Sequence, residues 1–153
     1  MPTGSSPTST GVSISSSAVA ELASRRGLLD TSVVIDLPRI DPSRLPAESA
    51  ISALTLAELA AGPHATRDPG ERARRQQRLQ WAEATFDPLP FDLNAARTFG
   101  VVFAAVQRAG RRGRRRVVDL LIASVAAANG LPLYTRNAED FRGLARVVQV
   151  IEC

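Results

Sequence analysis

Large apolar residues in this chain gather into four short runs that are typical of buried strands. They cover residues 28–29, 50–55, 131–135 and 147–151. The first run is too short for its periodicity to be judged, but it follows a polar tail abruptly. The pattern predicts short strands separated by longer segments of other structure.

The segments between these runs carry the marks of helices. Thr31 and Ser32 can cap a short helix that begins at Val33, and Thr55 can cap the next one. Further helices are predicted over 70–86, which is polar, over 93–109, which is amphipathic, and over 119–128, which is apolar nearly all round. Strands that alternate with helices predict an α/β fold, a three-layer sandwich around a short, mostly parallel sheet.

Composition narrows the class of protein. The chain has 153 residues, enough for one domain with a real core, and its formal net charge is +4. We expect residues 1–26 to form a disordered or partly helical extension and 27–153 to form the domain. No apolar run is long enough to span a membrane and no signal peptide is evident, so we expect a cytoplasmic protein that does not bind membranes.

Three isolated acidic residues stand at the edges of the most apolar segments. Asp30 follows the first strand, Glu58 lies beyond the second, and Asp119 opens the apolar helix. A buried carboxylate is costly unless a cation compensates it, and ligands of open α/β sheets bind beyond the carboxyl ends of the strands. These residues therefore predict a metal site, although a capping box with Thr55 would also explain Glu58.

The motifs around these residues resemble the PIN-domain ribonucleases, and among them the VapC-type toxins of bacterial type II toxin–antitoxin systems. The resemblance covers residues 27–151. It rests on Leu-Leu-Asp-Thr-Ser with Asp30, Thr-Leu-Ala-Glu-Leu with Glu58, Asp-Leu-Leu-Ile-Ala with Asp119, and Leu-Tyr-Thr-Arg-Asn-Ala-Glu-Asp-Phe with Asn137 and Asp140. It implies a PIN-like fold.

The resemblance also implies a mechanism, a substrate and partners. Asp30 and Asp119 would bind Mg²⁺ or Mn²⁺, and Glu58 would bind it directly or through water. The fourth acidic position is split: Asp140 could complete the site or cap its own turn, and Asn137 could orient substrate or water. The expected activity is endoribonuclease cleavage of structured RNA, tRNA or rRNA, by a homodimer. A VapB-type antitoxin would block it in a heterotetramer or larger assembly.

Arginines form a run directly before the helix led by Asp119. Arg beside an acidic site is typical of phosphate recognition, although such a run is often only a solvated loop. Ser32 could likewise bond a carboxylate or a substrate phosphate. The predicted phosphate contacts are Arg111, Arg112, Arg114, Arg115 and Arg116.

Two other functions remain to be weighed. The first is a PIN-like domain that binds RNA or protein without cutting, which Asn137 in place of an Asp would favour. The second is an aspartyl phosphoacceptor enzyme with Asp30 as nucleophile, which is disfavoured because the chain has no Lys. The single histidine, His64, lies away from every motif and argues against a histidine-based ribonuclease.

Overall fold

The structure is a computed structural model that describes residues 13, 15–18, 25–110 and 117–153. Predictions made for the extension at 1–12, 14 and 19–24 lie outside the described residues. So do those for the five arginines of the run, Arg111, Arg112, Arg114, Arg115 and Arg116. None of the helices in the described ranges is both long and apolar enough to cross a bilayer.

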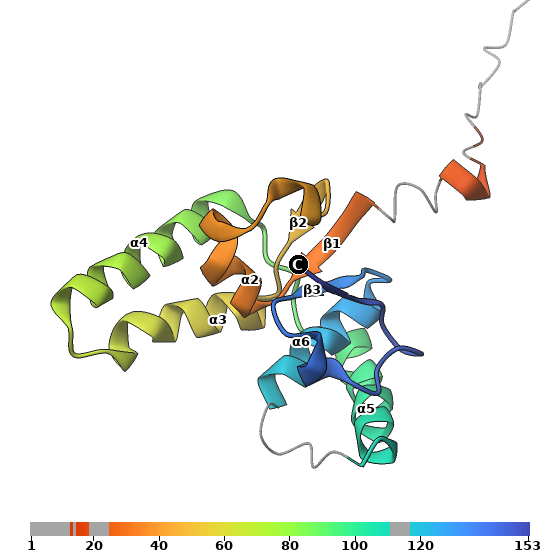
Figure 1. Ribbon diagram of the computed structural model, residues 1–153. Coiled ribbons are helices and arrows are strands. Elements are labelled where there is room, and N and C mark those ends of the chain that lie inside the picture. The colour runs from red at the N-terminus through yellow and green to blue at the C-terminus, as the bar shows by residue number, and fades with distance from the viewer. Residues whose placement is uncertain (1–12, 14, 19–24, 111–116) are drawn as a thin grey trace, which may run out of the picture.

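Four short strands form one fully parallel sheet (Figure 1). They are β1 (Arg26–Leu29), β2 (Glu48–Ala50), β3 (Leu133–Thr135) and β4 (Val150–Glu152), in the order β2-β1-β3-β4. The predicted parallel α/β architecture is confirmed. β1 and β3 are the central pair, so the residues that follow them emerge side by side at the carboxyl edge of the sheet.

Helices α2 (Thr31–Asp36), α3 (Ala53–Ala61) and α4 (Pro69–Thr85) cover one face of the sheet. α3 and α4 pack against each other and extend beyond the sheet as a helical hairpin (Figure 1). The core under these helices is made by Leu29, Val33, Val34, Ile40, Ile51, Leu59, Ala82, Tyr134 and Cys153.

Helices α5 (Leu93–Arg108) and α6 (Val117–Ala128) cover the opposite face and pack tightly on each other. Successive residues of a strand point to opposite faces, so Leu28 enters this second core while Leu29 enters the first. The nearly all-round apolar character of α6 is explained because it packs on the sheet, on α5 and on α3. The molecule therefore has the three layers predicted.

Short 3-10 turns connect these elements. They are η1 (Leu37–Arg39), η2 (Pro42–Arg44), η3 (Gly62–Ala65) and η4 (Ala138–Phe141). The strands are shorter than expected, and β2 ends at Ala50 rather than continuing to residue 55. The reason is that Ser52 already caps the next helix, which leaves no room for a longer strand.

Candidate active site

Asp30 stands at the carboxyl end of β1 and begins α2. Its side chain is buried, with 5% of the residue exposed, and its Oδ1 accepts the Val33 N–H at 3.1 Å and the Ser32 hydroxyl at 2.6 Å. The prediction that Thr31 and Ser32 cap this helix is wrong, because Asp30 keeps an extended backbone and its short carboxylate reaches the third amide of the helix. Both bonds described for this carboxylate fall on Oδ1.

Ser32 links Asp30 to the neighbouring strand. Its Oγ accepts the Arg136 N–H at 3.1 Å, so its own proton goes to Asp30. Arg136 is in turn fixed by Asp36, with Nε 3.2 Å from Oδ2, and by the Cys153 carbonyl. The geometry supports a carboxylate-orienting role for Ser32, and its contact with substrate stays a prediction.

Glu58 lies well inside α3, not at its start. The N-cap of that helix is Ser52, whose Oγ accepts the Thr55 N–H at 3.1 Å. The alternative reading of Glu58 as part of a capping box with Thr55 is therefore wrong, because the helix begins before Thr55. The half-buried Glu58 carboxylate instead accepts the hydroxyl proton of Thr31, the residue after Asp30.

Three hydroxyl groups form a chain that ends on Glu58. The Thr31 and Thr55 oxygens lie 3.3 Å apart, and Ser52 Oγ lies 3.4 Å from Thr55 Oγ1. An ionised carboxylate only accepts, so the Thr31 proton is used by Glu58 and Thr55 must supply the proton between the two threonines. Ser52 and Thr55 are completely buried, so this chain fixes the Thr31 hydroxyl that holds Glu58.

The remaining predicted site residues lie on elements that border this edge. Asp119 is in the first turn of α6, which packs against α3, and it is half-buried. Asn137 is exposed just beyond β3, where its N–H bonds Thr135 Oγ1 at 3.1 Å. Asp140 is half-buried within η4. Their assignment as ligands or orienting groups stays a prediction.

The donor chemistry suits a hard cation, but the described side chains do not enclose one. Among residues 25–110 and 117–153, no three His, Cys, Asp or Glu side chains are arranged to hold a metal ion together. Thr31, the residue after Asp30, donates to Glu58 and so connects the end of β1 with α3. Mg²⁺ commonly binds through one or two carboxylates and keeps several waters, so the carboxylates of Asp30 and Glu58 fit it.

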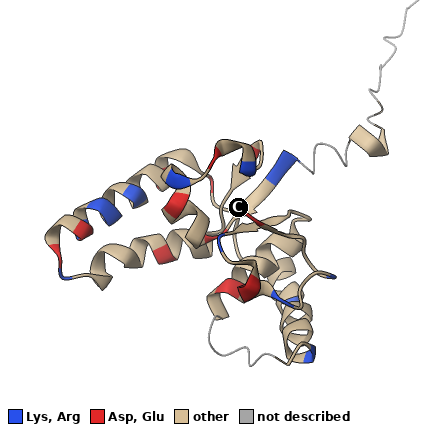
Figure 2. Ribbon diagram, in the orientation of Figure 1, with Lys and Arg blue, Asp and Glu red and all other residues tan. Residues whose placement is uncertain are grey.

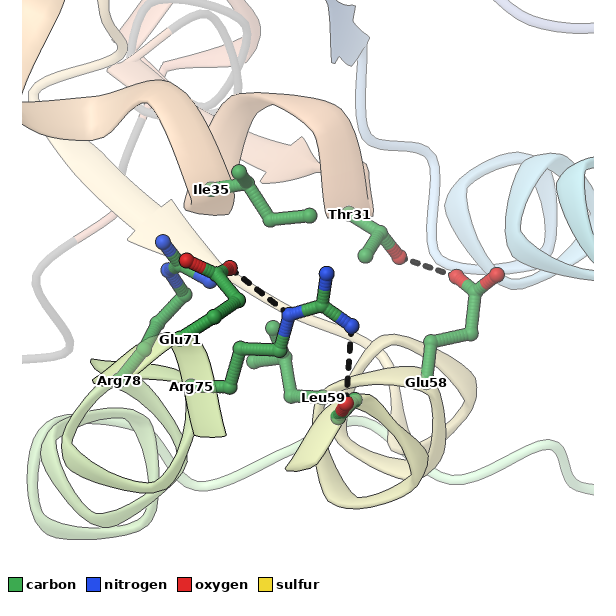
Figure 3. Close-up of a pocket in the computed structure, with 8 residues that line it drawn as sticks. Thr31, Ile35, Glu58, Leu59, Glu71, Arg75 and Arg78 are labelled. Carbon is green, nitrogen blue, oxygen red and sulfur yellow. Dashed lines mark hydrogen bonds and ion pairs between the residues drawn. The ribbon is translucent and has the colours of Figure 1, made fainter. Parts of the chain in front are cut away.

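A pocket of about 260 Å³ opens beside Glu58, between α2, α3 and α4 (Figure 3). Its wall on α4 includes Arg75, whose Nε donates to Glu71 Oε1 at 2.8 Å and whose Nη1 donates to the Gly62 carbonyl at 2.9 Å. The bonds from Arg75 and then Arg74 lower the pKa of Glu71. The lining residues are Thr31, Ile35, Glu58, Leu59, Gly62, Glu71, Arg75 and Arg78.

The sequence did not reveal this pocket. The segment 70–86 is correctly predicted as a polar helix, and the four-residue spacing of Glu71 and Arg75 is an available sign of an ion pair. Nothing local connects that pair with Glu58. Figure 2 shows basic positions along α4, whereas Glu58 is the only charged residue of α3.

Comparison with known proteins finds relatives that share most of this chain. Ribonuclease VapC5 of Mycobacterium tuberculosis is 37% identical over 130 residues, 82% of this chain and 93% of that protein. Ribonuclease VapC of Rickettsia bellii is 27% identical over 119 residues, 75% of this chain and 87% of that protein. The crystal structure of VapBC-5, a toxin–antitoxin system of M. tuberculosis, contains a chain that superposes with a TM-score of 0.74 and 35% identity, over 84% of this chain and 99% of that one.

The profile of the PIN domain matches residues 27–147. This range contains the carboxylates at the sheet edge and the helix that carries Asp119. With a sequence match over most of its length and the parallel sheet in place, the chain belongs to the PIN domain family.

Proposed function

We infer that this chain is an endoribonuclease and the toxin of a toxin–antitoxin pair. The observation that carries this inference is its 37% identity with Ribonuclease VapC5 over 93% of that protein. The carboxylates support it, because Asp30 ends β1 and Glu58 is bonded to the next residue, Thr31, at the sheet edge where this fold class binds its ligands.

The catalysis we propose depends on Mg²⁺ or Mn²⁺. Asp30 and Glu58 would hold the ion, with Asp119 and Asp140 completing the site. When bound, such an ion activates a water molecule and neutralises phosphoryl charge. The residues of this chain do the positioning: Ser32 and the Val33 amide fix one oxygen of Asp30, and Thr31 fixes Glu58.

The substrate we propose is structured RNA, tRNA or rRNA, and the partner is a VapB-type antitoxin. The similar VapBC-5 structure is a toxin–antitoxin system, which supports the partner. A homodimer held by helices, and a heterotetramer or larger assembly with the antitoxin, are also proposed. Exposed apolar side chains on α5 and α6 support a helical interface: Leu93, Val101, Phe103, Val117 and Val118.

The decisive experiment incubates the purified protein with tRNA and rRNA in Mg²⁺, in Mn²⁺ and in EDTA. We expect cleavage only with metal. Asp30→Asn should lower the cleavage rate by about 100-fold or more, because changes to groups that merely support metal ligands already cost 10–100-fold. Asn caps helices as well as Asp does, so this variant should keep its fold. Asp119→Asn should behave similarly.

The matched control is Asp87→Asn, which removes an exposed carboxylate outside the site. It should cleave at the wild-type rate. Cleavage that persists in EDTA would reject the metal mechanism. Tight RNA binding with no cleavage in any metal would favour the non-catalytic module instead, the alternative that Asn137 in place of an Asp favours.

A further inference from the structure

The pocket beside Glu58 has a wall with two arginines that the proposed chemistry does not use. Thr31 and Glu58 line it on the side of the sheet edge, and Arg75 and Arg78 line it on α4. In Figure 3 the guanidinium of Arg75 lies between α3 and α4, across from Thr31 and Ile35 of α2. The pocket therefore adjoins the candidate active site, and its wall on α4 carries Arg75 and Arg78 against the single carboxylate of Glu71.

Arg75 is held in place before any ligand arrives. Its Nε bonds Glu71 and its Nη1 bonds the Gly62 carbonyl, while its other terminal nitrogen points into the pocket (Figure 3). The side chain is only 31% exposed. A guanidinium fixed in this way loses little conformational freedom when it donates a further bond, and its planar shape matches a phosphate.

The charges on this wall do not cancel. Glu71 accepts bonds from both Arg74 and Arg75, so one carboxylate faces two guanidinium groups. Arg78 adds a third positive charge to the same face of α4, and it lines the pocket directly. Glu58 lies on the opposite wall, where its carboxylate accepts the Thr31 hydroxyl proton. The wall formed by α4 is therefore suited to an anion.

We propose that Arg75, assisted by Arg78, binds a backbone phosphate of the RNA next to the one that is cleaved. This rests on the proposed ribonuclease function, because an RNA strand with one phosphate at Asp30 and Glu58 would bring a neighbouring phosphate to the pocket that shares Glu58. The half-exposed Ile35 on the third wall offers an apolar surface for the intervening sugar. The pocket then directs the path of the RNA strand away from the candidate active site.

The test measures binding of fluorescently labelled bulk tRNA in EDTA, where binding is read without metal-dependent cleavage. The double variant R75Q/R78Q should weaken binding about tenfold or more, and each lost phosphate contact should reduce the slope of log affinity against log salt by about 0.7 to 0.9. Arg75→Lys should keep the salt dependence but bind more weakly than wild type. Lysine retains the positive charge but loses the forked donor geometry of the guanidinium group.

The matched control is Arg97→Gln, an exposed arginine on α5 across the sheet. If R75Q/R78Q, shown by circular dichroism to be folded, matches Arg97→Gln in affinity and salt slope, the proposal is wrong. If tRNA binding is unchanged but an acidic poly-glutamate peptide no longer binds, the pocket takes protein carboxylates and the proposal is also wrong. If wild type cuts no RNA yet the double variant loses tRNA binding, the phosphate site stands and the ribonuclease function falls.

Discussion

The hydroxyl groups of Ser52, Thr55 and Thr31 link the start of α3 to a carboxylate nearly two turns further along the same helix. Buried hydroxyls are costly unless they are bonded, and each of these finds its partner within the set or in the helix N-terminus. Glu58 therefore receives a donor whose direction is fixed by the groups behind it. Because Thr55 is completely buried, we expect it to act as a positioning residue.

Thr55→Val tests that role. Valine keeps the shape but removes the proton given to Thr31, so the Glu58 carboxylate is held less firmly. We expect the metal concentration for half-maximal cleavage to rise about 10- to 100-fold, the usual cost of removing a group that orients a metal ligand. Thr55→Ser should restore it.

The control for this series is Thr85→Val, an exposed threonine at the end of α4. Metal titrations of cleavage, read beside thermal unfolding curves, separate positioning from simple loss of fold. An unchanged metal requirement in a Thr55→Val protein that cleaves RNA would mean that the hydroxyl chain serves stability alone.

For individual residues, the sequence predicts some contacts and not others. Asp30 could be placed correctly because a strand end is a local feature. Glu58 was open to misreading because Ser52 and Thr55 are both good caps, and only the actual end of β2 decides between them. The pocket around Arg75 requires α4 to fold back along α3, which no local pattern specifies.

Among the elements, the central strand β1 depends on a close approach that only glycine permits. A Cβ at Gly27 would lie 2.4 Å from Cε2 and 2.7 Å from Cδ2 of Tyr134, which stands on β3. That ring is buried, and burial raises the pKa of its hydroxyl. The contact holds the two strands whose carboxyl ends carry Asp30 and Asn137.

Gly27→Ala should therefore destabilise the protein by about 1–3 kcal/mol, the usual cost of overpacking a core. Urea unfolding measures it. Gly100→Ala is the control of opposite sign, because that helical glycine has nothing within 4 Å of its Cβ position. Alanine there should be neutral or up to about 1 kcal/mol stabilising. Equal effects at both positions would contradict the close packing of Tyr134 on β1.

The bounds and the order of the strands could not be predicted from the sequence pattern. Their existence and their alternation with helices follow from the apolar runs, but strands of three or four residues carry no period long enough to set their bounds. Within the order β2-β1-β3-β4, the pairing of β1 with β3 joins segments about a hundred residues apart, and this long-range pairing brings Asp30 beside the end of β3.

For the molecule as a whole, the thin sheet couples two separate cores. Leu28 and Leu29 are adjacent in β1 and are both fully buried, yet one packs with α5 and α6 and the other with α2, α3 and α4. The site lies at the end of this same strand. Its geometry should therefore depend on both cores, which we expect to unfold together as in other single domains of this size.

Leu28→Ala and Leu29→Ala test this coupling. Each should cost about 2–5 kcal/mol, the range for deleting a buried leucine side chain. Unfolding in urea is followed by circular dichroism, which reports all helices, and by fluorescence of the single tryptophan, Trp81, on α4. The two signals should change at the same urea concentration in both variants. The control is Leu93→Ala, at a residue that is 65% exposed, which should change the stability little.

The coupling would be contradicted if Leu28→Ala shifted the circular dichroism transition but left the Trp81 transition in place. The two cores would then unfold independently, and the sheet would not couple them.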